Sequence, residues 1–96
     1  MLQLPSQVTA TEARDLLARF SLALPADVNG QLVTVDASAV AQLDSSCIAL
    51  LLALRRRVQA GGGSFGLTGA GAPLLALVRA YGLDGLLSPD AESAPL

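Results

Sequence analysis

The chain has 96 residues, which is enough for one compact domain and too few for two cores of ordinary size. Hydrophobic residues make up 52% of it and aromatic residues only 3%, so the sequence predicts a folded domain with an aliphatic core. The formal net charge of -2 provides no general field that would attract phosphate backbones or anionic lipids, which argues against nucleic-acid binding.

The amino-terminal segment predicts a short strand followed by a helix. Residues 2–4 alternate as an edge strand does, and Pro5 limits the length of that strand. Thr9 and Glu12 have the spacing of a capping box, so we expect the first helix to begin there. The apolar stripe of this helix consists of Ala13, Leu16, Leu17 and Phe20.

The middle of the chain predicts two strands separated by a long helix. Residues 32–35 are almost wholly apolar and β-branched, as expected of a strand buried on both faces, and Asp36 marks the end of this strand. We expect the second helix to extend from about Ser45 to Ala60, with the glycines of residues 61–63 closing it. The next predicted strand covers residues 64–68.

A third helix follows that strand. Pro73 fits its first turn, and Gly82 lies where a closing glycine is expected. Its apolar stripe consists of Leu74, Leu77, Val78 and Tyr81. Strands that alternate with helices indicate an α/β domain with crossover helices, which we place at residues 1–88, followed by a loose tail at residues 89–96.

Residues that usually carry catalysis or bind metals are scarce. The chain has no histidine, and Cys47 has no companions at metal-ligand spacing, which excludes a zinc site and a His-assisted nucleophile. The glycines near residues 69–71 lack the third glycine of a dinucleotide fingerprint, so ordinary turn glycines are favoured. We interpret Asp36 and Asp44 as turn and cap residues rather than a catalytic pair. We therefore expect no enzyme, no cofactor and no metal.

The second helix carries two stripes when its residues are spaced at about 100° each. The stripe expected to face the sheet consists of Cys47, Leu50, Leu51, Leu54 and Val58. The other stripe combines a hydroxyl, apolar groups and a cation, and consists of Ser45, Ile48, Ala49, Leu52 and Arg56. We interpret this second stripe as a partner-binding surface, and a core that wraps around both flanks of the helix is an equal alternative. The arginines of residues 55–57 complement the helix dipole or contribute to that surface.

The start of the second helix combines an acid with two hydroxyls. Asp44 and Ser46, together with Asp36, are expected to support the loop and the helix cap. Ser45 is a phosphorylation candidate, because a phosphate at a helix N-terminus is stabilised by the dipole and by free amides. Such a group would also add about two negative charges to an interface there and so act as a switch.

Three segments of the chain resemble the STAS family, which includes anti-sigma-factor antagonists and the small STAS subunit of Mla-type phospholipid-transport ABC systems. The segments are Val-Thr-Val-Asp-Ala-Ser at residues 33–38, Leu-Asp-Ser-Ser-Cys-Ile-Ala-Leu-Leu-Leu at residues 43–52, and Ala-Tyr-Gly-Leu-Asp-Gly-Leu-Leu at residues 80–87. The resemblance implies a STAS-like α/β fold with about four mostly parallel strands and three main helices. Most members have a hairpin of two strands before the first helix. This chain has room only for residues 2–4 there, so we expect the first strand to be missing.

The resemblance also implies a non-catalytic interaction module with two candidate partners. In the transporter branch the position of Ser45 contacts the ABC-type ATPase, and residues 49–52 match the Ala-Leu-Leu-Leu run of that branch. In the antagonist branch the hydroxyl after the aspartate is phosphorylated by an anti-sigma factor with serine kinase activity, although Cys47 here replaces the usual glycine. We expect the ATPase as partner and keep the anti-sigma-factor antagonist as the alternative.

The sequence carries no signal for direct membrane insertion. It begins without a positively charged leader segment, and its longest apolar run, residues 48–54, is far shorter than the roughly 20 residues that span a bilayer. We expect a cytoplasmic protein, which the partner complex would place at the periphery of the inner membrane.

Overall fold

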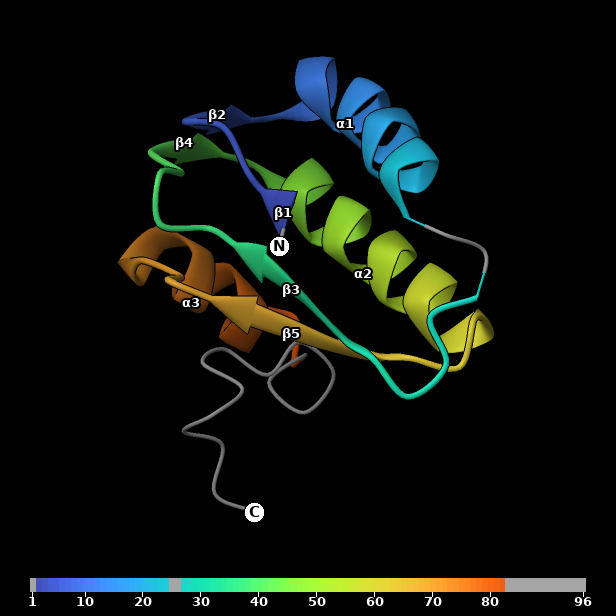
Figure 1. Ribbon diagram of the computed structural model, residues 1–96. Helices are drawn as coiled ribbons and strands as arrows, with labels where there is room; N and C mark the ends of the chain where they lie inside the picture. Colours follow the sequence, from blue (N-terminus) through green and yellow to red (C-terminus); the bar gives the residue numbers. More distant parts are fainter. Residues whose placement is uncertain (1, 25–26, 83–96) are drawn as a thin grey trace.

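Helices and parallel strands alternate along the chain in the computed structural model, which describes residues 2–24 and 27–82 (Figure 1). The strands are β1 (Leu2–Gln3), β2 (Gln7–Val8), β3 (Leu32–Asp36), β4 (Gln42–Leu43) and β5 (Ser64–Thr68). The helices are α1 (Ala10–Ala23), α2 (Ser45–Ala60) and α3 (Ala72–Ala80). The predicted α/β class is confirmed, and α2 has the predicted bounds.

The strands form two separate parallel sheets. The main sheet has the order β1-β3-β5, with β3 and β5 paired from Leu32 opposite Ser64 to Asp36 opposite Thr68. It therefore has three strands, slightly fewer than predicted. A second sheet pairs β2 with β4, in parallel. Two strands of two residues each thus precede α1, so the expectation that one of them would be missing was wrong. The two lie in different sheets, however, and do not form a hairpin with each other.

The core is built around α2, which contacts α1, β5 and α3. Figure 1 shows α1 and α2 side by side on one side of the main sheet, with α3 on the other side of β5. The predicted core stripe of α2 is entirely buried, and consists of Cys47, Leu50, Leu51, Leu54 and Val58. This arrangement confirms the aliphatic core, in which each fully buried leucine contributes about 1.5–3 kcal/mol.

Burial on both faces is not continuous along β3. Val35 is fully buried, but Leu32 at the other end of the strand is 59% exposed. Figure 1 shows α3 near the carboxyl ends of β3 and β5, so this short helix does not reach the end at which β3 begins. The prediction of a strand buried along its whole length was therefore wrong at Leu32.

Glycine and proline residues mark the ends of α2 and α3 largely as predicted. Gly62, after α2, has a φ of +86°, which is the left-handed conformation that glycine adopts without strain. Pro73 lies in the first turn of α3, and Gly82 follows that helix with a φ of +68°. Tyr81 was predicted to join the apolar stripe of α3 but is 50% exposed, because it lies at the C-cap beyond the helix. The predicted tail and residues 83–88 lie outside the described residues.

Candidate functional site

The N-termini of α1 and α2 lie side by side because the strands that precede them are paired. β2 leads into Thr9, the N-cap of α1, and β4 leads into Asp44, the N-cap of α2. In the parallel register of these strands Val8 lies opposite Leu43, so the two helices start at equivalent points. This pairing brings Ser45, the first residue of α2, to the same end of the molecule as the start of α1.

The Asp44 carboxylate binds the start of both helices. Its Oδ1 accepts a hydrogen bond from the Ser46 amide at 2.8 Å, and its Oδ2 accepts one from the Ala10 amide at 3.3 Å. Amides in a first helical turn have no partner within the helix, and a carboxylate there also stabilises the dipole. Sequence analysis predicted the cap on α2. It did not predict the bond to α1, because residues 34 positions apart share no local pattern.

Glu12 forms a second polar cluster at this end of the molecule. Its Oε1 accepts hydrogen bonds from the Thr9 hydroxyl at 2.6 Å and from the Thr9 amide at 2.9 Å, and its Oε2 accepts one from Gln7 Nε2 at 3.1 Å. The Thr9 hydrogen bonds lower the pKa of Glu12 below its usual 4.5, and the nearby charge of Asp44 opposes that shift. This cluster fixes the start of α1.

Asp36 supports the loop that follows β3. Its Oδ1 accepts a hydrogen bond from the Ser38 amide at 2.9 Å, and hydrogen bonding to Ser38 lowers the pKa of Asp36 below its usual 3.8. Gly69, on the loop after β5, has a φ of +68°, and a Cβ there would lie 2.8 Å from Asp36 Oδ1. The two loops therefore approach each other closely at the carboxyl ends of β3 and β5. Asp36 accepts one backbone hydrogen bond and Asp44 accepts two, so both carboxylates support a turn or a helix start.

Acid is expected to weaken the fold through Glu12 and Asp36. Both have a pKa below the usual value, so their stabilising contribution is present above the unfolded pKa and is lost as the pH falls through the folded one. We expect the midpoint temperature of thermal unfolding, measured by circular dichroism, to decrease as the pH is lowered from about 5 to about 3. The Glu12→Gln variant keeps an acceptor oxygen without a titrating group and should lose less stability over this interval. An equal loss in both proteins would contradict a role for Glu12.

The predicted partner stripe of α2 is divided in the structure. Ser45, Ala49 and Arg56 are exposed, whereas Ile48 is only 3% exposed and belongs to the core. Leu52 is half-buried and packs against the core. Because α2 contacts α1, β5 and α3, its buried arc is wider than one stripe. Placing Ile48 on an exposed surface was therefore wrong, and at this position the core wraps around the helix.

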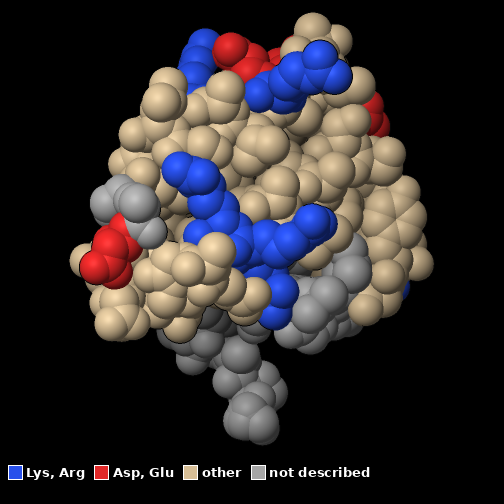
Figure 2. Space-filling model, turned by 90° about the vertical axis from the view of Figure 1, so that its right-hand side faces the viewer, with Lys and Arg blue, Asp and Glu red and all other residues tan. Residues whose placement is uncertain are grey.

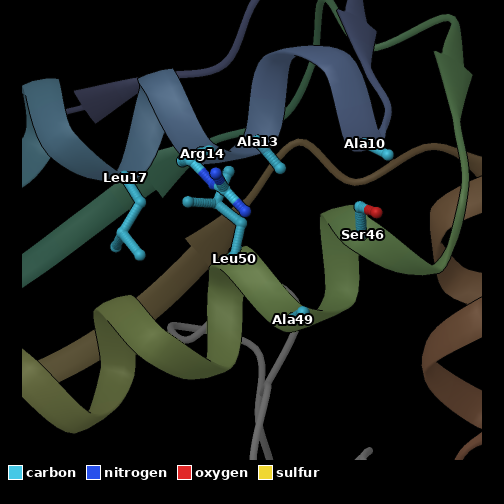
Figure 3. Close-up of a pocket in the computed structure, with 7 residues that line it drawn as sticks. All are labelled: Ala10, Ala13, Arg14, Leu17, Ser46, Ala49 and Leu50. Carbon is cyan, nitrogen blue, oxygen red and sulfur yellow. The ribbon is translucent and has the colours of Figure 1, made fainter.

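An open groove of about 350 Å³ separates the N-terminal halves of α1 and α2 (Figure 3). From α1 it is lined by Ala10, Ala13, Arg14 and Leu17. From α2 it is lined by Ser46, Ala49 and Leu50. The alanines leave room that larger side chains would fill. Among the predicted site residues, the groove brings together only Ser46 and Ala49.

The contribution of α1 to this groove was missed by sequence analysis. Arg14 falls away from the centre of the apolar stripe of this helix, and no role was predicted for it. The available signal was weak, consisting of the small residues Ala10 and Ala13 one helical turn apart.

Cys47 is a buried structural residue. It is inaccessible to solvent, and burial, followed by the nearby charge of Asp44, raises its pKa to about 11. No group of three or more potential metal ligands occurs within residues 2–24 and 27–82. Over the same ranges, no helix has the length and apolar character needed to cross a bilayer.

Arginines mark the opposite end of α2. Figure 2 shows basic side chains gathered on the side of the molecule where α2 ends. Arg57 donates a hydrogen bond to the carbonyl oxygen of Ser21 at 3.1 Å, and that carbonyl lies in the last turn of α1. Arg56 and Arg57 are both exposed, and Arg57 links α2 to the last turn of α1.

Comparison with known proteins assigns a family to this architecture. The family model described as "Mlab, STAS domain" matches residues 1–88, which is most of the chain. Comparisons with curated proteins and with solved structures give no match.

Proposed function

Because the chain belongs to the STAS domain family, we propose that it is the accessory subunit that binds the ATPase of a phospholipid-transport ABC system. STAS domains are in general non-catalytic interaction modules. The description of the matching family model names Mlab, and residues 49–52 resemble the Ala-Leu-Leu-Leu run of the transporter branch. In this role the protein would lie in the cytoplasm, held at the inner membrane by the complex.

The observation that carries the proposal is the exposed surface at the start of α2. Ser45 and Ala49 are one helical turn apart, and both are exposed. In the described part of the chain, the Ser45 hydroxyl has no hydrogen-bond partner, whereas the neighbouring Asp44 carboxylate is occupied by two amides. This end of α2 therefore offers a small apolar contact and a hydroxyl that a partner protein can use.

A substitution at Ala49 tests the proposal. Because Ala49 is exposed, Ala49→Glu should leave the fold intact while it introduces bulk and charge into the interface. We expect its affinity for the purified ATPase subunit, measured by calorimetry, to fall by at least about tenfold. The matched control is Ala60→Glu, which makes the same change at an exposed alanine at the other end of α2. Leu52 is less suitable, because it packs against the core. Equal binding by both variants would contradict the proposal.

A second candidate is an anti-sigma-factor antagonist controlled by phosphorylation. It is favoured by the exposure of Ser45 in the first turn of α2, which leaves the hydroxyl accessible to a kinase. The added charge would release the partner kinase. This candidate predicts that an anti-sigma factor with serine kinase activity adds one phosphate to the chain and none to Ser45→Ala, as read by intact mass. The buried Cys47, in place of the usual glycine, favours the transporter role.

A further inference from the structure

The groove between α1 and α2 contains a cation that the described part of the chain does not neutralise. Arg14 lines the groove and is exposed. Within residues 2–24 and 27–82, the one ion pair joins Arg19 to Asp15, on the same helix. Figure 3 shows the Arg14 side chain reaching from α1 toward Leu50 on α2. The fold therefore places an available guanidinium over an aliphatic surface.

The remaining groove residues are mainly aliphatic. Ala13 and Leu17 on α1 face Ala49 and Leu50 on α2 across the groove. The volume of about 350 Å³ is at the low end for binding clefts, and the groove is open along the two helices. This shape suits a few side chains presented from the surface of another protein better than an enclosed small molecule.

The charges around the groove determine where an anionic group can bind. Asp44 binds the amide of Ala10, which lines the groove, and Glu12 lies at the same end of α1. These carboxylates disfavour a second anion near the helix N-termini. Arg14, further along α1, is the position at which a carboxylate is stabilised, since a guanidinium can bind a carboxylate through two parallel hydrogen bonds.

We propose that the groove receives a segment of the partner ATPase in which an Asp or Glu pairs with Arg14 and a neighbouring aliphatic side chain packs between α1 and α2. The inference rests on the proposed function and names the chemistry of its partner. It adds Arg14 to the binding surface and makes α1, as well as α2, part of the interface. The exposed Ala49 belongs both to the groove and to the exposed surface at the start of α2, so these two parts of the proposed interface are continuous.

Charge reversal at Arg14 tests this inference. We expect Arg14→Glu to weaken binding of the purified ATPase subunit by at least about tenfold, and Arg14→Lys to retain most of the affinity. Arg19→Glu is the matched control, because it makes the same change on an exposed residue of α1 that does not line the groove. Circular dichroism should show that all three variants are folded, since both arginines are exposed on a helix.

Cross-linking identifies the partner segment directly. Ala10→Cys places a thiol in the groove and Ala18→Cys places one elsewhere on α1, while the buried Cys47 does not compete for the reagent. With a short thiol-reactive photo-cross-linker, only the first variant should yield an ATPase peptide, and that peptide should contain Asp or Glu. Changing this acid to Arg should restore binding to Arg14→Glu.

The outcomes separate this inference from the proposed function. If the unmodified protein does not bind the ATPase, the proposed function is wrong and the groove assignment fails with it. If the unmodified protein binds and Arg14→Glu binds as well as Arg19→Glu, the proposed function stands and the groove assignment is wrong. A cross-linked segment without a carboxylate would also overturn the assignment.

Discussion

Replacing Leu54 with alanine is expected to lower the free energy of unfolding by about 3 kcal/mol, within the range of about 2–5 kcal/mol observed for buried leucines. Leu54 is inaccessible to solvent on α2, the helix that contacts α1, β5 and α3. The truncation removes buried apolar surface and leaves a cavity that the surrounding elements fill only in part. Urea denaturation followed by circular dichroism should show a lower midpoint with an unchanged slope.

The control for Leu54→Ala is the same chemical change on the surface. Leu22 is 89% exposed on α1, so Leu22→Ala should change the free energy of unfolding by less than about 0.5 kcal/mol. A Leu54→Ala effect as small as that of Leu22→Ala would contradict a core centred on α2.

The parts of the fold predicted correctly are those with strong local signals. α2 was predicted with its observed bounds because Asp44 caps its start, apolar residues recur at helical spacing, and glycines follow Ala60. β5 was also predicted with its observed bounds, as a short run between the glycines of residues 61–63 and Gly69. In these segments the local sequence and the packing favour the same conformation.

The short strands could not be predicted in the same way. β2 and β4 contain two residues each, Gln7–Val8 and Gln42–Leu43, and two residues cannot show an alternating pattern. Each of these strands forms by pairing with the other, which lies more than thirty residues away in the chain, as the pairing of Val8 with Leu43 shows. This missed pair aligns the starts of α1 and α2, so the error concerned the element that positions the candidate site.

The candidate site was predicted in part for a related reason. A helical projection gives the angle of each side chain around α2, but not which neighbouring element covers that angle. It therefore grouped the buried Ile48 with the exposed Ser45 and Ala49. Likewise, no role was predicted for Arg14 on α1, because the groove exists only once α1 lies against α2. Site residues that lie on one helix could be identified from the sequence. A surface formed by two helices could be identified only from the structure.

Asp44→Ala is expected to affect both stability and partner binding, because this carboxylate accepts hydrogen bonds from both helix starts. Loss of an N-cap usually costs about 0.5–2 kcal/mol, and the bond to the Ala10 amide is lost as well. We therefore expect the free energy of unfolding to fall by about 2 kcal/mol in urea denaturation. Binding to the proposed ATPase partner should weaken too, because the groove depends on how the first turns of α1 and α2 are aligned.

Asp44→Asn separates these two effects. An asparagine keeps one acceptor oxygen for the Ser46 amide, but its amide group replaces the oxygen that binds the Ala10 amide. Because asparagine caps helices about as well as aspartate, we expect this variant to lose less stability than Asp44→Ala. Its affinity for the proposed ATPase partner should still fall, since two donors would then face each other between the helix starts. Binding equal to that of the unmodified protein would show that the contact between Asp44 and α1 does not shape the interface, and that Asp44 serves α2 alone.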